Sequence, residues 1–150
     1  MYTEERTRPI EILLVEDNPG DVRLIQEALK DSKPLLNLHV VVDGEKALDC
    51  LYQKGQYGNA VRPDIILLDL NLPRKDGREV LAEIKADRDL KSIPVVVVTT
   101  SKNEQDILQA YNMHANSYIT KPQVLDQFME VIKSIENYWL TTVRLPTRDG

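Results

Sequence analysis

The chain has 150 residues, 42% of them hydrophobic, and a formal net charge of −5 at pH 7. This length suits one hydrophobic core, and Cys50, the only cysteine, excludes an internal disulfide and is typical of a reducing compartment. The charge argues against nucleic acid as a partner, no apolar stretch approaches the ~20 residues that span a bilayer, and residues 1–11 lack a secretory signal, so we expect a cytoplasmic protein that binds neither nucleic acid nor membrane.

In chain order, the first half of the sequence predicts three strands separated by two helices. The first strand is the apolar run over residues 12–15, and Asn18 then caps a helix that has proline at its first position. Residues 38–42 form the second strand, and Asp43 caps the second helix. After a polar loop, the bulky apolar residues 65–68 are typical of a strand that is buried on both faces.

The second half of the chain continues this alternation. Past Gly77, apolar residues at helical spacing predict a third helix, and the valines of residues 95–98 predict a fourth strand. Residues 118–120 form a short fifth strand, and a long final helix runs over residues 124–143.

A fourth helix is expected between the last two strands. Ser101 and Glu104 have the spacing of a capping box at its start. Ile107, Leu108 and Tyr111 are expected to form its inward face.

Strands that alternate with helices indicate the α/β class. Right-handed crossovers between parallel strands leave few topologies. We therefore expect a doubly wound five-stranded parallel sheet in the flavodoxin-like order 2-1-3-4-5, with an extended C-terminal helix.

Residues suited to phosphoryl chemistry follow four of the expected strands. Glu16 and Asp17 come after the first strand and Asp69 after the third, while Thr99 follows the fourth and Lys121 the fifth. In a parallel sheet the carboxyl ends of the strands meet at one edge, and ligands bind there beside the switch point. The expected order places strands 1 and 3 side by side, so we expect the three carboxylates to lie together.

Three clustered carboxylates need compensating charge. A Mg²⁺ ion supplies +2 and Lys121 supplies +1, which brings the formal charge of this cluster to zero, and oxygen ligands suit this hard ion. An aspartate beside a divalent ion is a feasible nucleophile toward phosphorus. Lys121 and the hydroxyl of Thr99 are then placed to hold the oxygens of a transferred phosphoryl group.

Each of these residues also has an ordinary structural interpretation. An isolated aspartate after an apolar strand is more often a cap or turn residue, so Asp69 alone would not indicate chemistry. Thr99 can simply cap the following helix, and Tyr118 can be an aromatic residue that only packs in the core or at the edge of the sheet. The register of Asp69 with the acidic pair and with Lys121 favours the functional interpretation.

Five ordered motifs resemble the receiver domain of two-component response regulators. They lie at residues 14–17, 67–73, 76–77, 94–99 and 118–122. The resemblance implies a phospho-accepting switch in a phosphorelay rather than an enzyme, with only self-catalysed phosphoryl transfer to Asp69 and slow autodephosphorylation. The phosphoryl donor would be a sensor histidine kinase.

The same resemblance implies the roles at a metal site. Asp69 is the expected phosphoacceptor. Asp17 is the expected direct Mg²⁺ ligand, and Glu16 reaches the ion mainly through water. Asn71 is expected to offer its backbone carbonyl to the metal.

The remaining site residues are also assigned by resemblance. Thr99 matches the switch hydroxyl of the family, Tyr118 its switch aromatic, and Lys121 its site lysine. The bond between Lys121 and Pro122 resembles a cis peptide that aims the lysine inward.

A narrower resemblance is to the small response regulators that serve cyanobacterial phytochromes. It is carried by residues 62–65, 72–81 and 135–140. It implies a phytochrome-type histidine kinase as the partner.

We expect residues 1–150 to form a single receiver domain, with its core at about 10–140, a C-terminal extension at 141–150 and no output domain. The signal would then leave through protein contacts. Apolar residues beyond one stripe of the final helix predict a homodimer. Its candidate surface comprises Phe128, Val131, Ile135, Tyr138, Trp139, Leu140 and Val143.

Two other functions stay open from the sequence. A haloacid-dehalogenase-like phosphatase also uses a nucleophilic aspartate and Mg²⁺, but it needs an acid two residues further on. Here that position is Asn71. The second alternative is a receiver-like scaffold that is not phosphorylated, against which the complete set of site residues argues.

Overall fold

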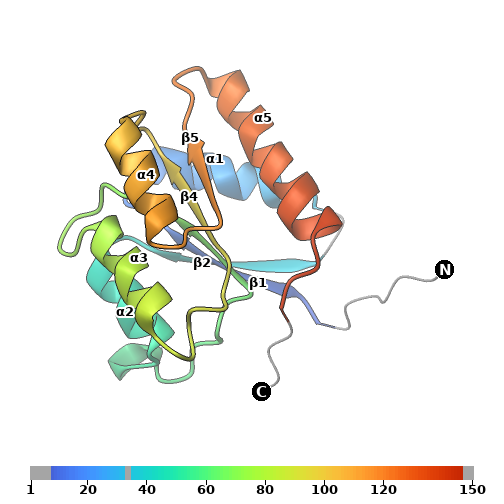
Figure 1. Cartoon of the computed structure of the whole chain (residues 1–150). Helices are drawn as coiled ribbons and strands as arrows, with labels where there is room; N and C mark the ends of the chain where they lie inside the picture. Colours follow the sequence, from blue (N-terminus) through green and yellow to red (C-terminus); the bar gives the residue numbers. More distant parts are fainter. Residues whose placement is uncertain (1–7, 33–34, 147–150) are drawn as a thin grey trace.

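The structure is a computed structural model that describes residues 8–32 and 35–146. It contains one parallel sheet of five strands in the order β2-β1-β3-β4-β5, which confirms the predicted topology (Figure 1). The strands are β1 (Ile10–Val15), β2 (Leu36–Val41), β3 (Ile65–Leu68), β4 (Val95–Thr99) and β5 (Ser117–Thr120). The α-helices are α1 (Pro19–Leu29), α2 (Gly44–Leu51), α3 (Gly77–Ala86), α4 (Glu104–Asn112) and α5 (Leu125–Ile135), and Gly55–Tyr57 forms a short 3₁₀ turn.

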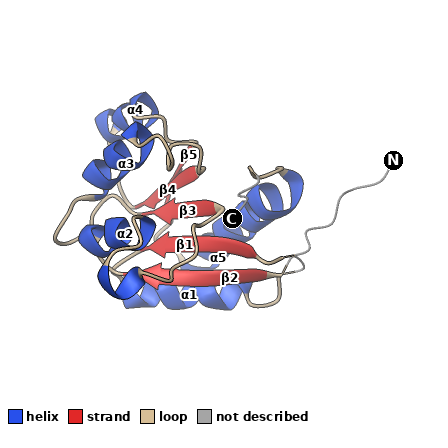
Figure 2. Cartoon of the chain, turned by 90° about the horizontal axis from the view of Figure 1, so that it is seen from below, coloured by secondary structure: helices blue, strands red, loops and turns tan. Residues whose placement is uncertain are grey.

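Helices cover both faces of the sheet (Figure 2). One apolar cluster lies between the sheet and α2, α3 and α4, and the other lies between the sheet and α1 and α5. Successive residues of a strand point to opposite faces, so Leu13 joins the first cluster while Ile12 and Leu14 join the second. Burial on both faces explains why the central strands are continuous apolar runs.

Side-chain caps fix where the first helices begin. The Asn18 side chain accepts a hydrogen bond from the backbone N–H of Asp21 at 3.1 Å, and that of Asp43 accepts from Lys46 at 2.7 Å. Both caps were predicted from the sequence.

The start and the inner face of α4 differ from the prediction. Asn103, not Ser101, is the cap, because its side chain accepts from the backbone N–H groups at the start of the helix. Leu108 and Tyr111 are 63% and 47% exposed, whereas Ala110 is buried. A small residue faces the sheet here, so α4 can approach closely while its larger side chains point outward.

The C-terminal helix is not one continuous α-helix. After α5, Glu136–Thr142 form a π-helical segment with wider turns. In an α-helix the residue four positions after buried Ile135 would face the sheet, but here the buried residue comes five positions later. Leu140 is therefore buried, and Trp139, expected on that face, is only partly covered.

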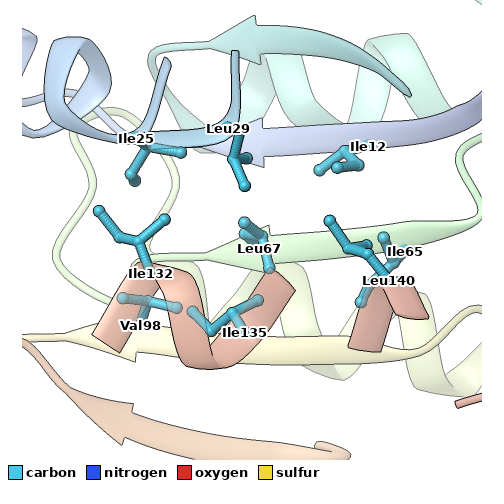
Figure 3. Close-up of a pocket in the computed structure, with 9 residues that line it drawn as sticks. All are labelled: Ile12, Ile25, Leu29, Ile65, Leu67, Val98, Ile132, Ile135 and Leu140. Atoms are coloured by element: carbon cyan, nitrogen blue, oxygen red, sulfur yellow. The ribbon is translucent and has the colours of Figure 1, made fainter. Parts of the chain in front are cut away.

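Leu140 closes a small apolar cavity beneath the π-helical segment (Figure 3). The cavity lies between α1, α5 and the sheet, and its walls include Ile12 and Ile65 from the central strands. Leu125, the first residue of α5, is 56% exposed. None of the helices within the described residues is both long and apolar enough to cross a membrane.

Candidate functional site

The backbone of three candidate site residues is hydrogen-bonded to the neighbouring strand, just past the end of its own strand. The backbone N–H of Glu16 donates to the carbonyl of Val41 at 3.0 Å, and that of Asp69 donates to Val15 at 3.1 Å. Lys121 donates in the same way to Thr99 at 2.7 Å. The sheet hydrogen bonds thus continue one residue beyond the strands and hold these side chains at one edge.

Lys121 lies at the centre of this edge. Its Nζ is 2.6 Å from Oε1 of Glu16, 2.9 Å from Oδ2 of Asp21 and 3.1 Å from Oδ2 of Asp69. The lysine side chain is only 4% exposed. A buried ammonium group is tolerated when several hydrogen-bonded carboxylates surround it, and this arrangement supplies three.

Asp21 was not predicted as a site residue. It lies in the first turn of α1, and an acidic residue at a helix N-terminus is usually explained by the helix dipole alone. Its distance in sequence from Lys121 hides the contact. The available signal was the approach of the α1 N-terminus to the carboxyl end of β1, which brings its first-turn residues to the same edge.

The electrostatics of the cluster reflect burial and mutual contact. Burial raises the pKa of Glu16 to about 7, a rise that the hydrogen bond from Lys121 partly offsets and the charge of Asp69 increases. Burial would lower the pKa of Lys121, but its hydrogen bonds to Glu16 and Asp21 outweigh burial and raise that pKa. The lysine therefore stays charged at neutral pH.

Three carboxylates at this edge are spaced to share a cation. One oxygen each from Glu16, Asp17 and Asp69 lies within 4.8 Å of the others. Glu16 is buried and uses both oxygens, accepting from Lys121 at 2.6 Å and from the Asn18 N–H at 3.2 Å. Asp17 is exposed. This donor set, with Asp17 open to solvent, fits a hard, partly hydrated ion such as Mg²⁺.

The segment after Asp69 lies close against it. The N–H of Asn71 donates to Oδ1 of Asp69 at 3.2 Å. At Gly77, a Cβ would come within 2.2 Å of the Asp69 carbonyl oxygen, so no larger residue fits without movement. The N–H of Gly77 also donates to the carbonyl of Leu70 at 2.9 Å. The start of α3 is therefore fixed against the candidate phosphoacceptor.

Thr99 is fully buried, and its hydroxyl has no hydrogen-bond partner among the described residues. A buried hydroxyl without a partner costs about 1–3 kcal/mol. An oxygen-rich group at this edge of the sheet would supply the missing partner.

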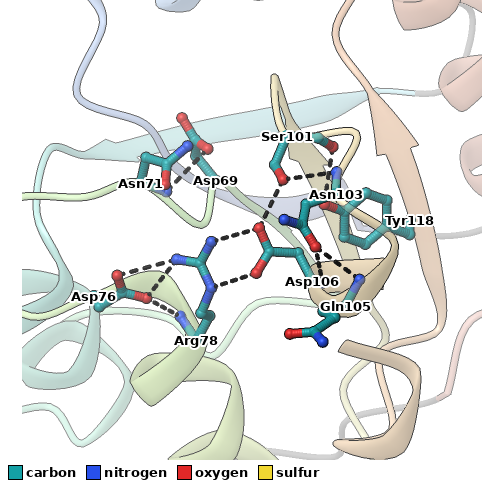
Figure 4. Close-up of polar contacts among 9 residues, drawn as sticks. All are labelled: Asp69, Asn71, Asp76, Arg78, Ser101, Asn103, Gln105, Asp106 and Tyr118. Atoms are coloured by element: carbon teal, nitrogen blue, oxygen red, sulfur yellow. Dashed lines mark hydrogen bonds and ion pairs between the residues drawn. The ribbon is translucent and has the colours of Figure 1, made fainter. Parts of the chain in front are cut away.

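Tyr118 contacts the loop between β4 and α4. Its Oη donates to the carbonyl oxygen of Ser101 at 3.0 Å (Figure 4). Its backbone N–H donates to the hydroxyl oxygen of Tyr111 at 3.1 Å. Burial raises the pKa of its phenol, although the Ser101 contact opposes that rise. Arg78 and Asp106, which the sequence did not single out, lie in the same hydrogen-bonded group.

The peptide bond between Lys121 and Pro122 was predicted to be cis, and this prediction is wrong. The described residues contain no cis peptide bond. The trans form is the intrinsically favoured one, and in it the lysine side chain already reaches Asp69 at 3.1 Å.

Part of the predicted dimer surface is also wrong. Phe128, Ile135 and Leu140 are 4%, 5% and 6% exposed within the single chain, because they belong to the apolar cluster under α5. Of the predicted set, Tyr138 is 56% exposed. Val131, Trp139 and Val143 are partly exposed.

Comparison with protein families gives one match that covers most of the chain. A family model described as the response regulator receiver domain matches residues 12–133. The response regulator Rcp1 of Synechocystis sp. is 52% identical over 144 residues, which cover 96% of this chain and 98% of that protein. The probable methanogenesis regulatory protein FilR2 of Methanothrix harundinacea is 40% identical and covers 95% of this chain, with 91% of its own length matched.

Two solved structures are similar over their whole length. The Mn²⁺-bound form of the response regulator Rcp1 has a TM-score of 0.92 at 53% identity, with 93% of this chain and 100% of that one covered. The phosphorylated cyanobacterial phytochrome response regulator RcpA has a TM-score of 0.91 at 56% identity with the same coverage.

Proposed function

Because this chain belongs to the response regulator receiver family, we propose that it accepts a phosphoryl group on Asp69 from a histidine kinase in a Mg²⁺-dependent phosphorelay. One observation carries the proposal. The buried ammonium of Lys121 lies 3.1 Å from Asp69, at the edge where the acidic cluster and the unpartnered hydroxyl of Thr99 also lie.

The proposed reaction transfers a phosphoryl group from an imidazole nitrogen of the kinase to the carboxylate of Asp69. A carboxylate oxygen of Asp69 forms a bond to phosphorus while the bond from phosphorus to the donor imidazole nitrogen breaks, and the released imidazole takes up a proton. Lys121 and the Thr99 hydroxyl bind oxygens of the transferred group. Asp17, Asp69 and the carbonyl of Asn71 would hold a Mg²⁺ ion, with Glu16 acting mainly through water, and the bound ion would supply charge neutralisation.

The product persists because no acid follows the nucleophile. A phosphatase of the haloacid-dehalogenase type has a general acid two residues after its aspartate, whereas Asn71 here donates its backbone N–H to Asp69. This chemistry favours a switch with slow autodephosphorylation over a turning-over enzyme.

The kinase we propose is of the cyanobacterial phytochrome type. Support comes from the 56% identity to a protein described as a cyanobacterial phytochrome response regulator. We further propose that residues 1–150 act as one receiver domain in the cytoplasm and signal through protein contacts. A homodimer remains part of this proposal, with its surface narrowed to Val131, Tyr138, Trp139 and Val143.

The decisive experiment measures the intact mass of the protein after incubation with acetyl phosphate, with and without Mg²⁺. A phosphoryl adduct is expected in the wild type with Mg²⁺ and not in Asp69→Asn. Asp49→Asn, an exposed acid of α2, is the matched control and should keep the adduct. An adduct of equal yield in Asp69→Asn would overturn the assignment.

A further inference from the structure

The strand β2 forms one outer edge of the sheet, and no strand of the described chain pairs with its far side (Figure 2). The backbone N–H of Ile10 in β1 donates to the carbonyl of Leu35, and from there every second residue of β2 bonds to β1. The residues between them turn their N–H and C=O groups away from β1. Those with such free backbone groups are Leu36, Leu38 and Val40.

This edge lacks the features that usually keep an edge strand unpaired, which are charged side chains, proline and bulges. The strand reads Leu-Asn-Leu-His-Val-Val, without an acidic residue, lysine, arginine or proline, although 29% of the whole chain is charged. Its register with β1 is unbroken from end to end, so it contains no bulge. Leu35 and Val42, which flank the strand, are 72% and 45% exposed. The edge is therefore open to pairing along its whole length.

The two faces of β2 differ in chemistry. On the face covered by α1 and α5, its side chains are apolar and partly buried against the core cluster. On the other face, Asn37 and His39 both bind the buried carboxylate of Glu11, from Nδ2 at 3.0 Å and from Nε2 at 2.7 Å. Oδ1 of Asn37 and Nδ1 of His39 have no hydrogen-bond partner among the described residues. Each of these side chains thus keeps one polar atom free for a neighbouring strand.

A second copy of this chain has an edge that matches. Two copies related by a two-fold axis perpendicular to the sheet place their β2 strands antiparallel. With the axis at Leu38, that residue lies opposite its own copy and Leu36 lies opposite Val40, so every free backbone group within the strand finds a partner. The same register sets Asn37 opposite His39 on the other face, where both have a free polar atom.

We propose that β2 is an interface between two copies of this chain, joined by antiparallel pairing centred on Leu38. The contact shares no residue with the dimer surface proposed above and does not require a phosphoryl group on Asp69. It therefore goes beyond the proposed function, and its failure would leave that function untouched. A chain that uses both surfaces assembles beyond the dimer, so the test has to report on β2 alone.

The test is disulfide trapping at the two-fold axis, in full chains whose only native thiol is removed by Cys50→Ala. Directly opposite residues of an antiparallel pair have Cα atoms about 4.5–5.5 Å apart, which a disulfide can span. Leu38→Cys should therefore form a covalent dimer on mild oxidation, measured by intact mass. Val61→Cys is the control, because this loop residue is 54% exposed but lies on no proposed surface, and it should stay monomeric.

A second experiment tests the register at exposed positions. Asn37→Cys and His39→Cys, again without Cys50, should link to each other when the two proteins are mixed, because the two residues lie directly opposite. Either variant alone has to link to its own copy along a diagonal of about 7–8 Å, which is beyond the reach of a disulfide. The mixed dimer, identified by its mass, should be the main product.

A folded Leu38→Cys that stays monomeric, or that links no faster than Val61→Cys, would overturn the interface. If Leu38→Cys does not fold, the mixture of the two exposed variants decides the question alone. Self-linked Asn37→Cys in the same amount as the mixed dimer would overturn the pairing centred on Leu38. The phosphoryl adduct on Asp69 is measured separately, so neither result bears on the proposed function.

Discussion

The ammonium group of Lys121 is shared among three carboxylates, and Asp21 is the one outside the acidic cluster that is spaced for a metal. Oδ2 of Asp21 lies 2.9 Å from Nζ of Lys121 and attracts it. Asp21 therefore competes with Asp69, and with an incoming phosphoryl group, for the ammonium group. Asp21 also changes the charge balance that the sequence predicted. With four carboxylates, Lys121 and Mg²⁺, the formal charge of the site is −1 rather than zero.

Asp21→Asn should therefore speed the phosphorylation of Asp69 by acetyl phosphate, by about threefold to tenfold for the removal of one charge near the site. The rate of adduct formation by intact mass measures this. Glu27→Gln, on the same helix but paired with Lys30, removes the same charge away from the site and should leave the rate unchanged. A slower rate in Asp21→Asn would show that the residue supports Lys121 rather than competing for it.

Gly77 is the residue at which the backbone of the site leaves no room. Gly77→Ala would place a Cβ 2.2 Å from the Asp69 carbonyl oxygen, so the free energy of unfolding should fall by about 1–3 kcal/mol or more. Gly58→Ala is the matched control, because its nearest contact is at 3.5 Å and its φ is −56°. Urea denaturation compares the two variants, and equal stabilities would contradict the close approach.

At the scale of elements, Leu140 is the buried side chain through which the π-helical segment Glu136–Thr142 enters the apolar cluster. Leu140→Ala should lower the free energy of unfolding by about 2–5 kcal/mol, because it enlarges an apolar cavity that is already present beneath the segment. Leu108→Ala, at an exposed position of α4, should change it by less than about 0.5 kcal/mol. Equal losses in both variants, measured with urea, would show that Leu140 is not buried in solution.

The contact between α3 and α4 should depend on pH. The hydrogen bonds from Arg78 and then Ser101 lower the pKa of Asp106 below its ordinary value of 3.8. A lowered pKa in the folded state means that the ion pair contributes stability above pH 3.8, and that this contribution is lost as the pH falls through the folded pKa. The stability difference between the wild type and Asp106→Asn should be constant above about pH 5 and shrink below about pH 4. A difference that is independent of pH in urea denaturation would contradict this.

At the scale of the whole molecule, metal binding and folding are linked. A ligand that binds only the folded state adds about 2.7 kcal/mol of stability at one hundred times its Kd. Mg²⁺ should therefore raise the Tm of the wild type, and chelation should reverse the rise. Asp17→Asn should lose most of this effect, whereas Asp49→Asn should retain it. A Tm in Asp17→Asn that rises as much as in the wild type would remove Asp17 from the metal site.

Local patterns in the sequence carried much of the fold. The strands, the helices and the caps Asn18 and Asp43 follow from apolar periodicity and capping chemistry, which act over a few residues. The predicted start of α4 was wrong because Ser101 and Asn103 both have side chains that can cap a helix. Asn103 caps it, whereas the Ser101 hydroxyl donates a hydrogen bond to Asp106.

The sequence alone determined the sheet, its order and the five residues that gather at its carboxyl edge, because a parallel βα alternation leaves little freedom in where strand ends meet. Only the tertiary structure decided that Asp21 shares Lys121, that Arg78 reaches Asp106, and that Leu140 rather than Trp139 faces the core. These contacts join residues 100 and 28 positions apart in the chain, or depend on a single wider helical turn. No local periodicity encodes such contacts, since they depend on how whole elements are placed relative to one another.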